Sequence, residues 1–314
     1  MSAFLDTIQS AAGNDGQQSA LVSGLFSIFL IVTAIVYVAV ILFLLWAVFR
    51  RRRGESREGA LRSILVGWVG VTAMILAGLT IATWLYDREL AFAANTPALE
   101  IEITANQWWW DVRYADDEAS DIFRTANELH LPVGVPAHIT LRSNDVIHSF
   151  WVPNLAGKQD MIPGRENDIS ITPLREGVYR SQCAEFCGLQ HARMALDVTV
   201  ESRQAFAAWR AAQLRPAAAP PNRLAQLGQA IVTGRQCSSC HTVAGTSASG
   251  QVAPDLTHFA SRRTIAAGTL MMNRANIAAW IADPQAPKPG NNMPKVTLNA
   301  EELRAVTAYL ESLR

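Results

Sequence analysis

The sequence predicts a multidomain membrane protein with three structured parts: a two-helix transmembrane hairpin, an all-β sandwich and a small all-helical module. Three observations support this fold class. Two long apolar runs come first, alternating polar and apolar residues follow, and helical patterns return after a stretch rich in proline and alanine. The 314 residues are 50% hydrophobic and 17% charged, with a mean hydropathy of +0.11, which excludes a disordered or collagen-like chain.

The first part, residues 1–95, contains two candidate membrane spans at about 21–49 and 64–85. Each is long enough for the ~20 residues that a bilayer requires. The segment from Arg50 to Arg62 holds six arginines and two acids. Because basic loops between spans stay in the cytoplasm, both termini are expected outside. The residues before Leu21 include no Lys or Arg to begin a signal peptide, so the first span is expected to be retained, with a cleaved signal as the alternative.

The second part, residues 96–201, carries strand patterns and almost no helix pattern. Polar and apolar residues alternate in four short runs, and turns rich in proline and glycine separate them. These runs are Leu99–Ile103, His138–Leu141, Asp168–Ile171 and Ala195–Val200. The pattern favours an antiparallel sandwich or barrel of about 100 residues.

Residues 202–222 connect the sandwich to the last part through a helix and a stiff Pro/Ala linker, Pro216–Pro221. Residues 223–314 then open on a helical pattern and close on another. Asn299, an N-cap residue, with Glu302 three positions later, predicts the start of the closing helix. A small all-helical module is expected there.

The helical module contains a strong haem signal. Cys237-Ser-Ser-Cys240-His241 has the spacing for covalent attachment of a c-type haem, with the cysteines forming thioethers and the histidine binding the iron. A redox-active cysteine pair or part of a zinc site is the alternative, disfavoured because the flanking segments are helical and no second ligand pair follows. Met293, in a loop before the last helix, is the favoured sixth iron ligand over Met271 and Met272, since an irregular loop can lay a side chain across a haem face.

A second cluster lies in the sandwich. Two thiols, an imidazole and a thioether fall within the twelve residues Cys183-Ala-Glu-Phe-Cys187-Gly-Leu-Gln-His191-Ala-Arg-Met194. Soft sulfur with imidazole selects copper or zinc, and methionine favours copper. One cysteine more than a blue-copper site needs could bridge to a second metal ion, with His148 as the further imidazole. A Cys183–Cys187 disulfide with structural histidines remains the alternative.

With these residues, the chain resembles subunit II of haem–copper cytochrome c oxidases in the caa-type form, which has a cytochrome c domain fused at the C-terminus. The resemblance covers the hairpin, a cupredoxin-like sandwich and a class I cytochrome c domain, hence nearly the whole chain. It implies a binuclear copper A centre of two copper ions. In that centre Cys183 and Cys187 bridge both ions, His148 and His191 each bind one, Met194 is a weak ligand, and Glu185 binds through its main-chain carbonyl.

The same resemblance implies further roles and partners. The Glu185 side chain would also reach a magnesium ion at the border with subunit I, and Trp108 in Gln107-Trp-Trp-Trp110 would be the point where electrons enter. The expected cofactors are therefore two coppers, one covalent haem c and magnesium. The expected partners are the catalytic subunit I, subunit III, membrane lipid and an upstream cytochrome or cytochrome bc complex, with no nucleic acid. The location implied is a bacterial cytoplasmic membrane, with the copper and haem domains on the outer, periplasmic side.

Charge differs sharply between the two outer parts. Residues 100–197 carry 15 acids and 8 bases, whereas residues 223–314 carry 5 acids and 9 bases. Opposite net charges on tethered domains favour their docking, although solvated faces would give the same counts. Docking of the haem module near Trp108 is the expectation.

The expected function is that of the subunit through which electrons enter a respiratory terminal oxidase: from haem c to the copper pair, and on to a separate subunit that reduces O₂ to water. The chain itself shows no acid–base or nucleophilic constellation. The alternatives are the copper-bearing small subunit of a nitric oxide reductase and a membrane-anchored electron-transfer protein without a dedicated catalytic subunit. One departure from the resembling family is that Ala60–Trp68 lacks the Glu common near the start of the second span, which puts the usual proton-uptake route in doubt.

Overall fold

A computed structural model of the chain describes residues 8–50, 58–94, 99–115 and 118–314. The predicted boundary at residues 95–96 and four arginines of the loop between the spans, Arg51, Arg52, Arg53 and Arg57, lie outside the described residues. The chain divides into two compact units. One is residues 20–95, and the other joins the N-terminal residues up to Ser19 with residues 96–314.

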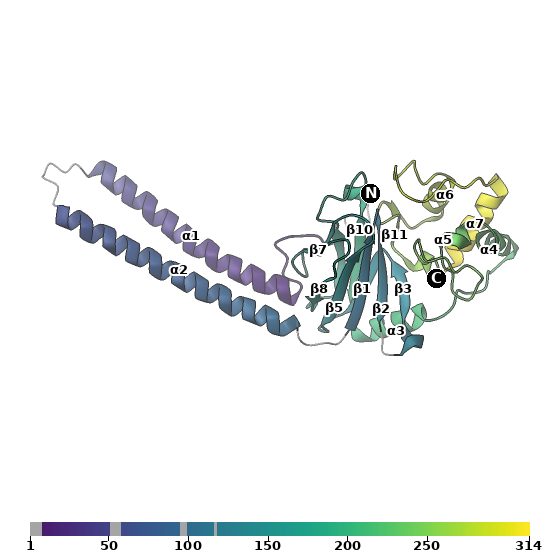
Figure 1. The fold of residues 1–314 in the computed structure, drawn as a ribbon, viewed down its shortest axis with the longest axis horizontal. Helices are drawn as coiled ribbons and strands as arrows, with labels where there is room; N and C mark the ends of the chain where they lie inside the picture. Colours follow the sequence, from purple (N-terminus) through teal and green to yellow (C-terminus); the bar gives the residue numbers. More distant parts are fainter. Residues whose placement is uncertain (1–7, 51–57, 95–98, 116–117) are drawn as a thin grey trace. The chain divides into compact units, whose positions relative to one another are not determined.

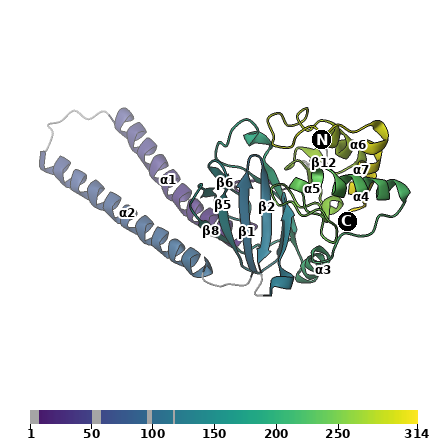
Figure 2. The ribbon, with the colours of Figure 1, turned by 45° about the vertical axis from the view of Figure 1, so that its right-hand side comes forward.

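The first unit consists of two long helices, α1 (Gln17–Phe49) and α2 (Glu58–Ala94), which run in opposite directions in Figures 1 and 2. Phe43 and Trp68 contact each other edge to face, with ring centroids 6.4 Å apart. Within the described residues, Gln17–Phe49 and Leu61–Leu90 are long and apolar enough to cross a bilayer, and their side chains are largely uncovered by the rest of the chain. Apolar surface of this kind calls for a lipid environment, as the sequence predicts.

The second unit is built on a β-sandwich. Its first five strands are β1 (Leu99–Asn106), β2 (Trp109–Ala115), β3 (Phe123–Ala126), β4 (Glu128–Pro132) and β5 (Ala137–Ser143). The next five are β6 (His148–Phe150), β7 (Gln159–Met161), β8 (Asn167–Ile171), β9 (Gly177–Gln182) and β10 (Ala195–Glu201). One sheet has the order β3-β2-β1-β5-β8, a second has β4-β10-β9, and β6 pairs with β7.

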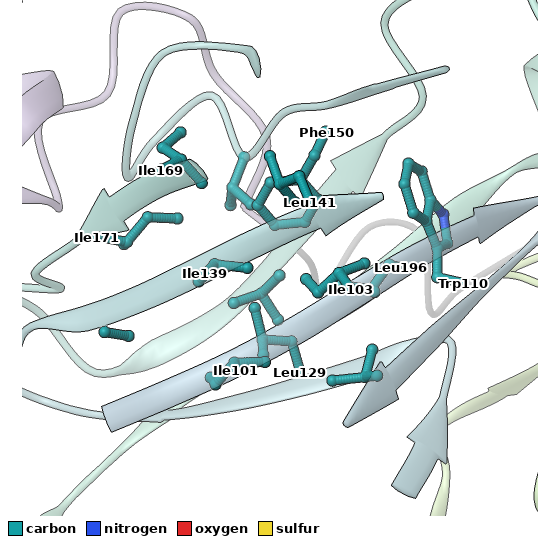
Figure 3. Packing of buried hydrophobic residues seen from close by; sticks show 14 of the residues in the cluster. Ile101, Ile103, Trp110, Leu129, Ile139, Leu141, Phe150, Ile169, Ile171 and Leu196 are labelled. Atoms are coloured by element: carbon teal, nitrogen blue, oxygen red, sulfur yellow. The ribbon is translucent and has the colours of Figure 1, made fainter. Parts of the chain in front are cut away.

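The alternation of apolar and polar side chains along the strands explains why the sheets pack face to face. Along β1 every second side chain is buried, and Ile101 and Ile103 point inward while Glu100 and Glu102 do not. Figure 3 shows the resulting core, in which branched aliphatic side chains from both sheets pack together, with Trp110 and Phe150 at the edge of the group. The four strands predicted from the sequence correspond to β1, β5, β8 and β10, each one to three residues longer than the pattern indicated.

The N-terminal tail also belongs to this unit, a contact that the sequence did not predict. Ile8 forms a bridge with Tyr179 of β9, and its backbone exchanges hydrogen bonds with Val178 and Arg180 at 2.8 and 3.1 Å. Asp15 is buried and accepts a hydrogen bond from the Asn154 side chain at 2.8 Å. Residues 8–19 are therefore an integral edge of the sandwich.

After the sandwich the chain is helical. The helices are α3 (Arg203–Gln213), α4 (Arg223–Gly234), the single turn α5 (Cys237–Cys240), α6 (Arg274–Ala282) and α7 (Ala300–Ser312), and a short hairpin of β11 (Thr264–Ile265) and β12 (Leu270–Met271) precedes α6. The predicted capping box at the start of α7 is confirmed, since Asn299 and Glu302 exchange side-chain to backbone hydrogen bonds at 2.9 Å. Helices α4 and α7 pack so closely that a Cβ on Gly228 would lie 2.0 Å from the Ala305 carbonyl oxygen.

Candidate metal and haem centres

The copper ligands predicted from the sequence come together at one end of the sandwich. His148 begins β6, and the loop from Cys183 to Met194 connects the antiparallel neighbours β9 and β10. A hydrogen bond from the Cys183 N–H to the Met194 carbonyl, at 3.0 Å, closes this loop at its base. The sheet therefore holds the two ends of the loop and brings the Cys, His and Met side chains onto one spot.

The side-chain atoms form a compact, soft donor set. The two cysteine sulfurs lie 3.7 Å apart, too far for a disulfide, and both thiols are free. His148 Nδ1 lies 3.8 Å from the Cys183 sulfur, and His191 Nδ1 lies 3.6 Å from the Cys187 sulfur. Each thiol thus has an imidazole of its own. The Met194 sulfur lies 3.9 Å from the Cys187 sulfur, and the Glu185 carbonyl lies 3.3 Å from the Cys183 sulfur.

This donor set fits copper. Cys183, Cys187, Met194 and His148 are each at most 2% exposed, so a bound ion would be shielded from water. Two thiolates, two imidazoles and a thioether without a carboxylate side chain suit a soft metal and not magnesium or calcium. The arrangement of one imidazole at each sulfur also matches two neighbouring metal positions.

Proton sharing between the thiols prepares the site for a metal. The hydrogen bond between the two sulfurs lowers the pKa of Cys183 and raises the pKa of Cys187, because the first thiolate is stabilised by the remaining thiol. Cys183 is therefore the thiol that ionises first, and a metal ion would displace the second proton.

Asp145 is a functional residue that the sequence analysis missed. Its Oδ1 lies 2.8 Å from Nε2 of His148, so the carboxylate fixes the ring and leaves Nδ1 directed to the sulfurs. The other carboxylate oxygen accepts a hydrogen bond from the Gln107 N–H at 2.6 Å. The i, i+3 spacing of Asp145 and His148 was the available signal.

The haem residues line a cavity of about 410 Å³ whose walls come mostly from the helical module and partly from the copper domain. Its walls include all four predicted haem residues, Cys237, Cys240, His241 and Met293, whereas Met271 and Met272 are not among the lining residues. Part of the remaining wall is apolar, including Leu256, Phe259, Ile265 and Trp280. A largely apolar cavity with two thiols on one short helix fits a c-type haem.

A hydrogen bond to the Pro254 carbonyl fixes the His241 ring in a form that can bind iron. Its Nδ1 lies 2.7 Å from the Pro254 carbonyl oxygen, so this nitrogen carries the proton and Nε2 is left as the lone-pair donor. Burial lowers the pKa of His241, which keeps the ring in the neutral form that binds a metal.

Trp108 connects the two ligand sets. Its indole N–H donates a 2.9 Å hydrogen bond to the carbonyl of Cys187, and the Gln107 side chain donates to the same oxygen at 2.7 Å. Trp108 and Trp109 also line the cavity that contains the haem residues. The structure therefore brings Trp108 between the copper loop and the haem pocket, while Trp110 is fully buried in the sandwich core.

The carboxylate of Glu185, predicted to reach magnesium, lies at the surface. Its Oε2 is 3.8 Å from Nζ of Lys158, and its side chain is 44% exposed. An exposed carboxylate at the copper loop is free to meet a partner surface. His130 and His138 are instead paired with carboxylates, His130 with Glu201 at 2.9 Å and His138 with Glu100 at 2.8 Å. His130 stacks on Trp209 with ring centroids 4.0 Å apart.

Comparison with known proteins agrees with this geometry. The family model for the periplasmic domain of cytochrome c oxidase subunit II matches residues 99–202, and the cytochrome c model matches residues 225–314. Cytochrome c oxidase subunit 2 of Alkalihalophilus pseudofirmus is 32% identical over 91% of this chain and 85% of its own length. This chain belongs to the cytochrome c oxidase subunit 2 family.

A second subunit 2 is similar over nearly the whole chain, and a solved structure is similar over part of it. Cytochrome c oxidase subunit 2 of Bacillus subtilis is 30% identical over 99% of this chain and 92% of its own length. The crystal structure of the periplasmic domain of cytochrome oxidase subunit II of Bradyrhizobium japonicum aligns with 38% of this chain and 96% of its own at 29% identity, with a TM-score of 0.36.

Membership of this family establishes the general activity and the class of cofactors. The chain is a subunit of an oxidoreductase, a haem–copper oxidase of the electron transport chain, and it associates with subunit I. Its subunit II domain implies a copper A centre, and its cytochrome c domain implies a haem. The two apolar helices fit membrane anchoring, and the match of residues 99–202 to a periplasmic domain agrees with an outer-side position for that domain.

Proposed function

We propose that this chain carries electrons into a terminal oxidase along one internal route: from a covalent haem c to a binuclear copper centre, and from there to subunit I, which reduces O₂ to water. The observation that carries the proposal is the position of Trp108. The same side chain lines the haem cavity and donates a hydrogen bond to Cys187 of the copper loop at 2.9 Å. When bound, haem and copper supply the one-electron carriers that amino-acid side chains lack.

The copper-loop residues would hold the copper ions and exclude water from them. Cys183 and Cys187 would bridge two copper ions, His148 and His191 would bind one each, and Met194 and the Glu185 carbonyl would complete the set. Their burial excludes water, and Asp145 fixes the ring of His148 by a 2.8 Å hydrogen bond. A site held this rigidly changes little in geometry when its charge changes, which favours rapid electron transfer.

The role of the haem residues is similar. Cys237 and Cys240 would form the two thioether bonds, and His241 would bind the iron through Nε2 while the Pro254 carbonyl holds its Nδ1. Met293 is proposed as the other iron ligand, because it is the methionine that lines the cavity. A thioether ligand raises the reduction potential of the haem, as suits a carrier that receives electrons from a donor outside the chain.

Two observations support a membrane orientation: the positive charge of the segment between α1 and α2, and the packing of residues 8–19 on the sandwich. We propose that the arginine-rich segment between α1 and α2 is cytoplasmic, with both termini and the copper and haem domains on the periplasmic side of a bacterial cytoplasmic membrane. The packing of residues 8–19 on the sandwich supports a common side for the tail and the copper domain. Subunit III, a cytochrome or cytochrome bc complex as donor, and a magnesium ion at Glu185 are further parts of the proposal.

The test uses the complex purified from the membrane. Metal analysis should give two copper ions and one covalent haem per copy of this chain, and a reduced donor should support O₂ consumption. Consumption of NO in place of O₂ would identify a nitric oxide reductase, and a chain that purifies without a large membrane partner would identify a free electron carrier. One haem without copper would refute the proposed route.

A substitution at the junction tests the route itself. Trp108→Phe removes the hydrogen bond to Cys187 and part of the π-system, so electron transfer from haem to copper should slow. Trp109→Phe is the matched control, because Trp109 lines the same cavity without that bond. Equal rates in both variants would remove Trp108 from the route.

A further inference from the structure

A loop of the haem module, residues 284–294, lies against the copper loop. This loop ends with the proposed iron ligand Met293, and Gly290 in its middle comes so close that a Cβ there would lie 3.2 Å from Leu189 and 3.8 Å from the Trp108 ring. The positive φ of 81° at Gly290 makes glycine the favoured residue at this contact. The segment that would position one face of the haem is therefore the segment that contacts the copper domain.

Lys288 is the buried centre of this contact. It is 2% exposed, and its ammonium group donates three hydrogen bonds, each 2.8 Å long, to the carbonyl oxygens of Trp108, Arg193 and Ala266. Trp108 and Arg193 belong to the copper domain, whereas Ala266 belongs to the haem module. All three donors of the ammonium are thus used, and two of them cross between the domains.

Four further hydrogen bonds connect the two domains around this lysine. The Gln190 side chain donates to the Pro289 carbonyl at 2.7 Å, Asn292 donates to the Gln107 carbonyl at 3.3 Å, and Arg193 donates to the Pro287 carbonyl. On the other side, the N–H of Ala195 at the start of β10 donates to Ala267, in the turn between β11 and β12, at 3.0 Å. All four contacts are hydrogen bonds to main-chain carbonyls.

A buried contact of this kind is a fixed dock and not a transient encounter. Charged groups buried in protein are screened by salt far less than exposed pairs. A free encounter between the acidic copper domain and the basic haem module would instead weaken as salt increases. A buried ammonium also costs free energy if its acceptors are removed, so undocking is disfavoured.

We propose that Lys288 is a positioning residue for electron transfer from haem to copper, holding the Met293 loop on the main chain of Trp108 and Arg193 so that the haem module stays docked. The proposal rests on the proposed function, since it concerns the step between the two centres. The observed rate of that step is the rate in the docked state multiplied by the docked fraction.

The experiment compares Lys288→Met with Lys295→Met in the complete oxidase complex. Both changes replace an ammonium by a thioether in the same module. Lys295, however, is an exposed residue whose side chain pairs at 3.1 Å with Asp283 within the module. Haem and copper contents are measured first, and the rate of haem-to-copper electron transfer is then followed after rapid reduction of the haem, at low and high ionic strength.

Lys288→Met should slow the transfer by at least about tenfold and make it decrease further with salt, because docking would then depend on long-range charge. The native complex and Lys295→Met should show fast transfer that salt barely changes. If Lys288→Met lost haem or copper, Lys288→Gln, which retains two N–H donors, should give an intermediate rate. Native-like, salt-independent transfer in the Lys288 variant would overturn the proposal, whereas absence of transfer in the native complex would instead refute the proposed function.

Discussion

The copper site and the haem site are built in opposite ways. The copper ligands lie at the ends of strands in a sandwich whose core, around Trp110, Phe150 and Ile103, is complete without a metal. The haem residues line a cavity of about 410 Å³ beside the small apolar core of a module of only about 90 residues, so a bound haem would extend that core into space that side chains leave open. One site is an addition to a finished fold, and the other is a part of its fold.

The largest effect should therefore follow loss of the haem. In a Cys237→Ser, Cys240→Ser double variant we expect the module to lose its stable helices, since an empty apolar cavity replaces a packed core. Limited proteolysis should remove residues after about 222 while the sandwich resists. A module that remains protease-resistant and helical without haem would contradict the comparison.

Loss of copper should abolish activity but spare the fold. Cys183→Ser removes one of the two sulfurs proposed to bridge the copper ions, so bound copper should fall to near zero and O₂ consumption should drop by at least about a hundredfold. The melting temperature of the sandwich should change little, because the core strands remain paired. Ser239→Ala, a change at an exposed residue of the haem module, is a control expected to retain copper and activity. Unfolding of the sandwich in the Cys183 variant would show that the copper site is not an addition.

The sandwich should be less stable in alkaline solution because of His130. Burial by itself would lower the pKa of this residue, but the hydrogen bonds that His130 donates to the Glu128 and Glu201 carboxylates, with their negative charges, raise it to about 9. A raised pKa means that protonated His130 stabilises the fold fully below its ordinary value of 6.5, and that this contribution disappears as the pH rises through 9. Deprotonation of His130 should therefore lower the free energy of unfolding by at most about 3 kcal/mol.

The measurement is thermal unfolding of the solubilised chain at pH 6 and pH 9.5. The native chain should lose stability across this range, and His130→Gln should be less stable at pH 6 and show a flatter profile. His138→Gln, at a more exposed position on β5, should behave like the native chain. A native profile in the His130 variant would exclude this residue as the cause.

A smaller effect should come from Gly228 in the haem module. In Gly228→Ala the added Cβ would overlap the Ala305 carbonyl, 2.0 Å away, so α4 and α7 must separate. We expect destabilisation of the module by about 2 kcal/mol, measured as a lower midpoint of denaturant unfolding of the haem-containing chain. Gly234→Ala, where the added atom meets open space, is the matched control. Equal midpoints in the two variants would show that the helices can separate at no cost.

Much of this architecture was predictable because its signals are local. Period-2 alternation marked β1 and β10, Asn299 and Glu302 marked the start of α7, and the fixed spacing of cysteines and histidines marked both centres. The position of His148 beside the loop at Cys183 could not be derived from local signals, since the fold of the sandwich alone brings these two segments together. It was predicted from the residue types and from the family resemblance. Contacts between carbonyls and distant side chains, such as those of Lys288, leave no pattern in sequence because any residue can supply the carbonyl.

The tail of residues 8–19 has a consequence for how the chain is made. Asn154 and Val178 form hydrogen bonds with residues that are synthesised before the first membrane helix, although both belong to a sandwich that is synthesised after the second. With the proposed orientation, in which the tail and the sandwich share the periplasmic side, the sandwich is complete only after residues 8–19 have also crossed the membrane. A fragment that starts after the hairpin would lack this edge, so export of the tail would be a step in the assembly of the copper domain.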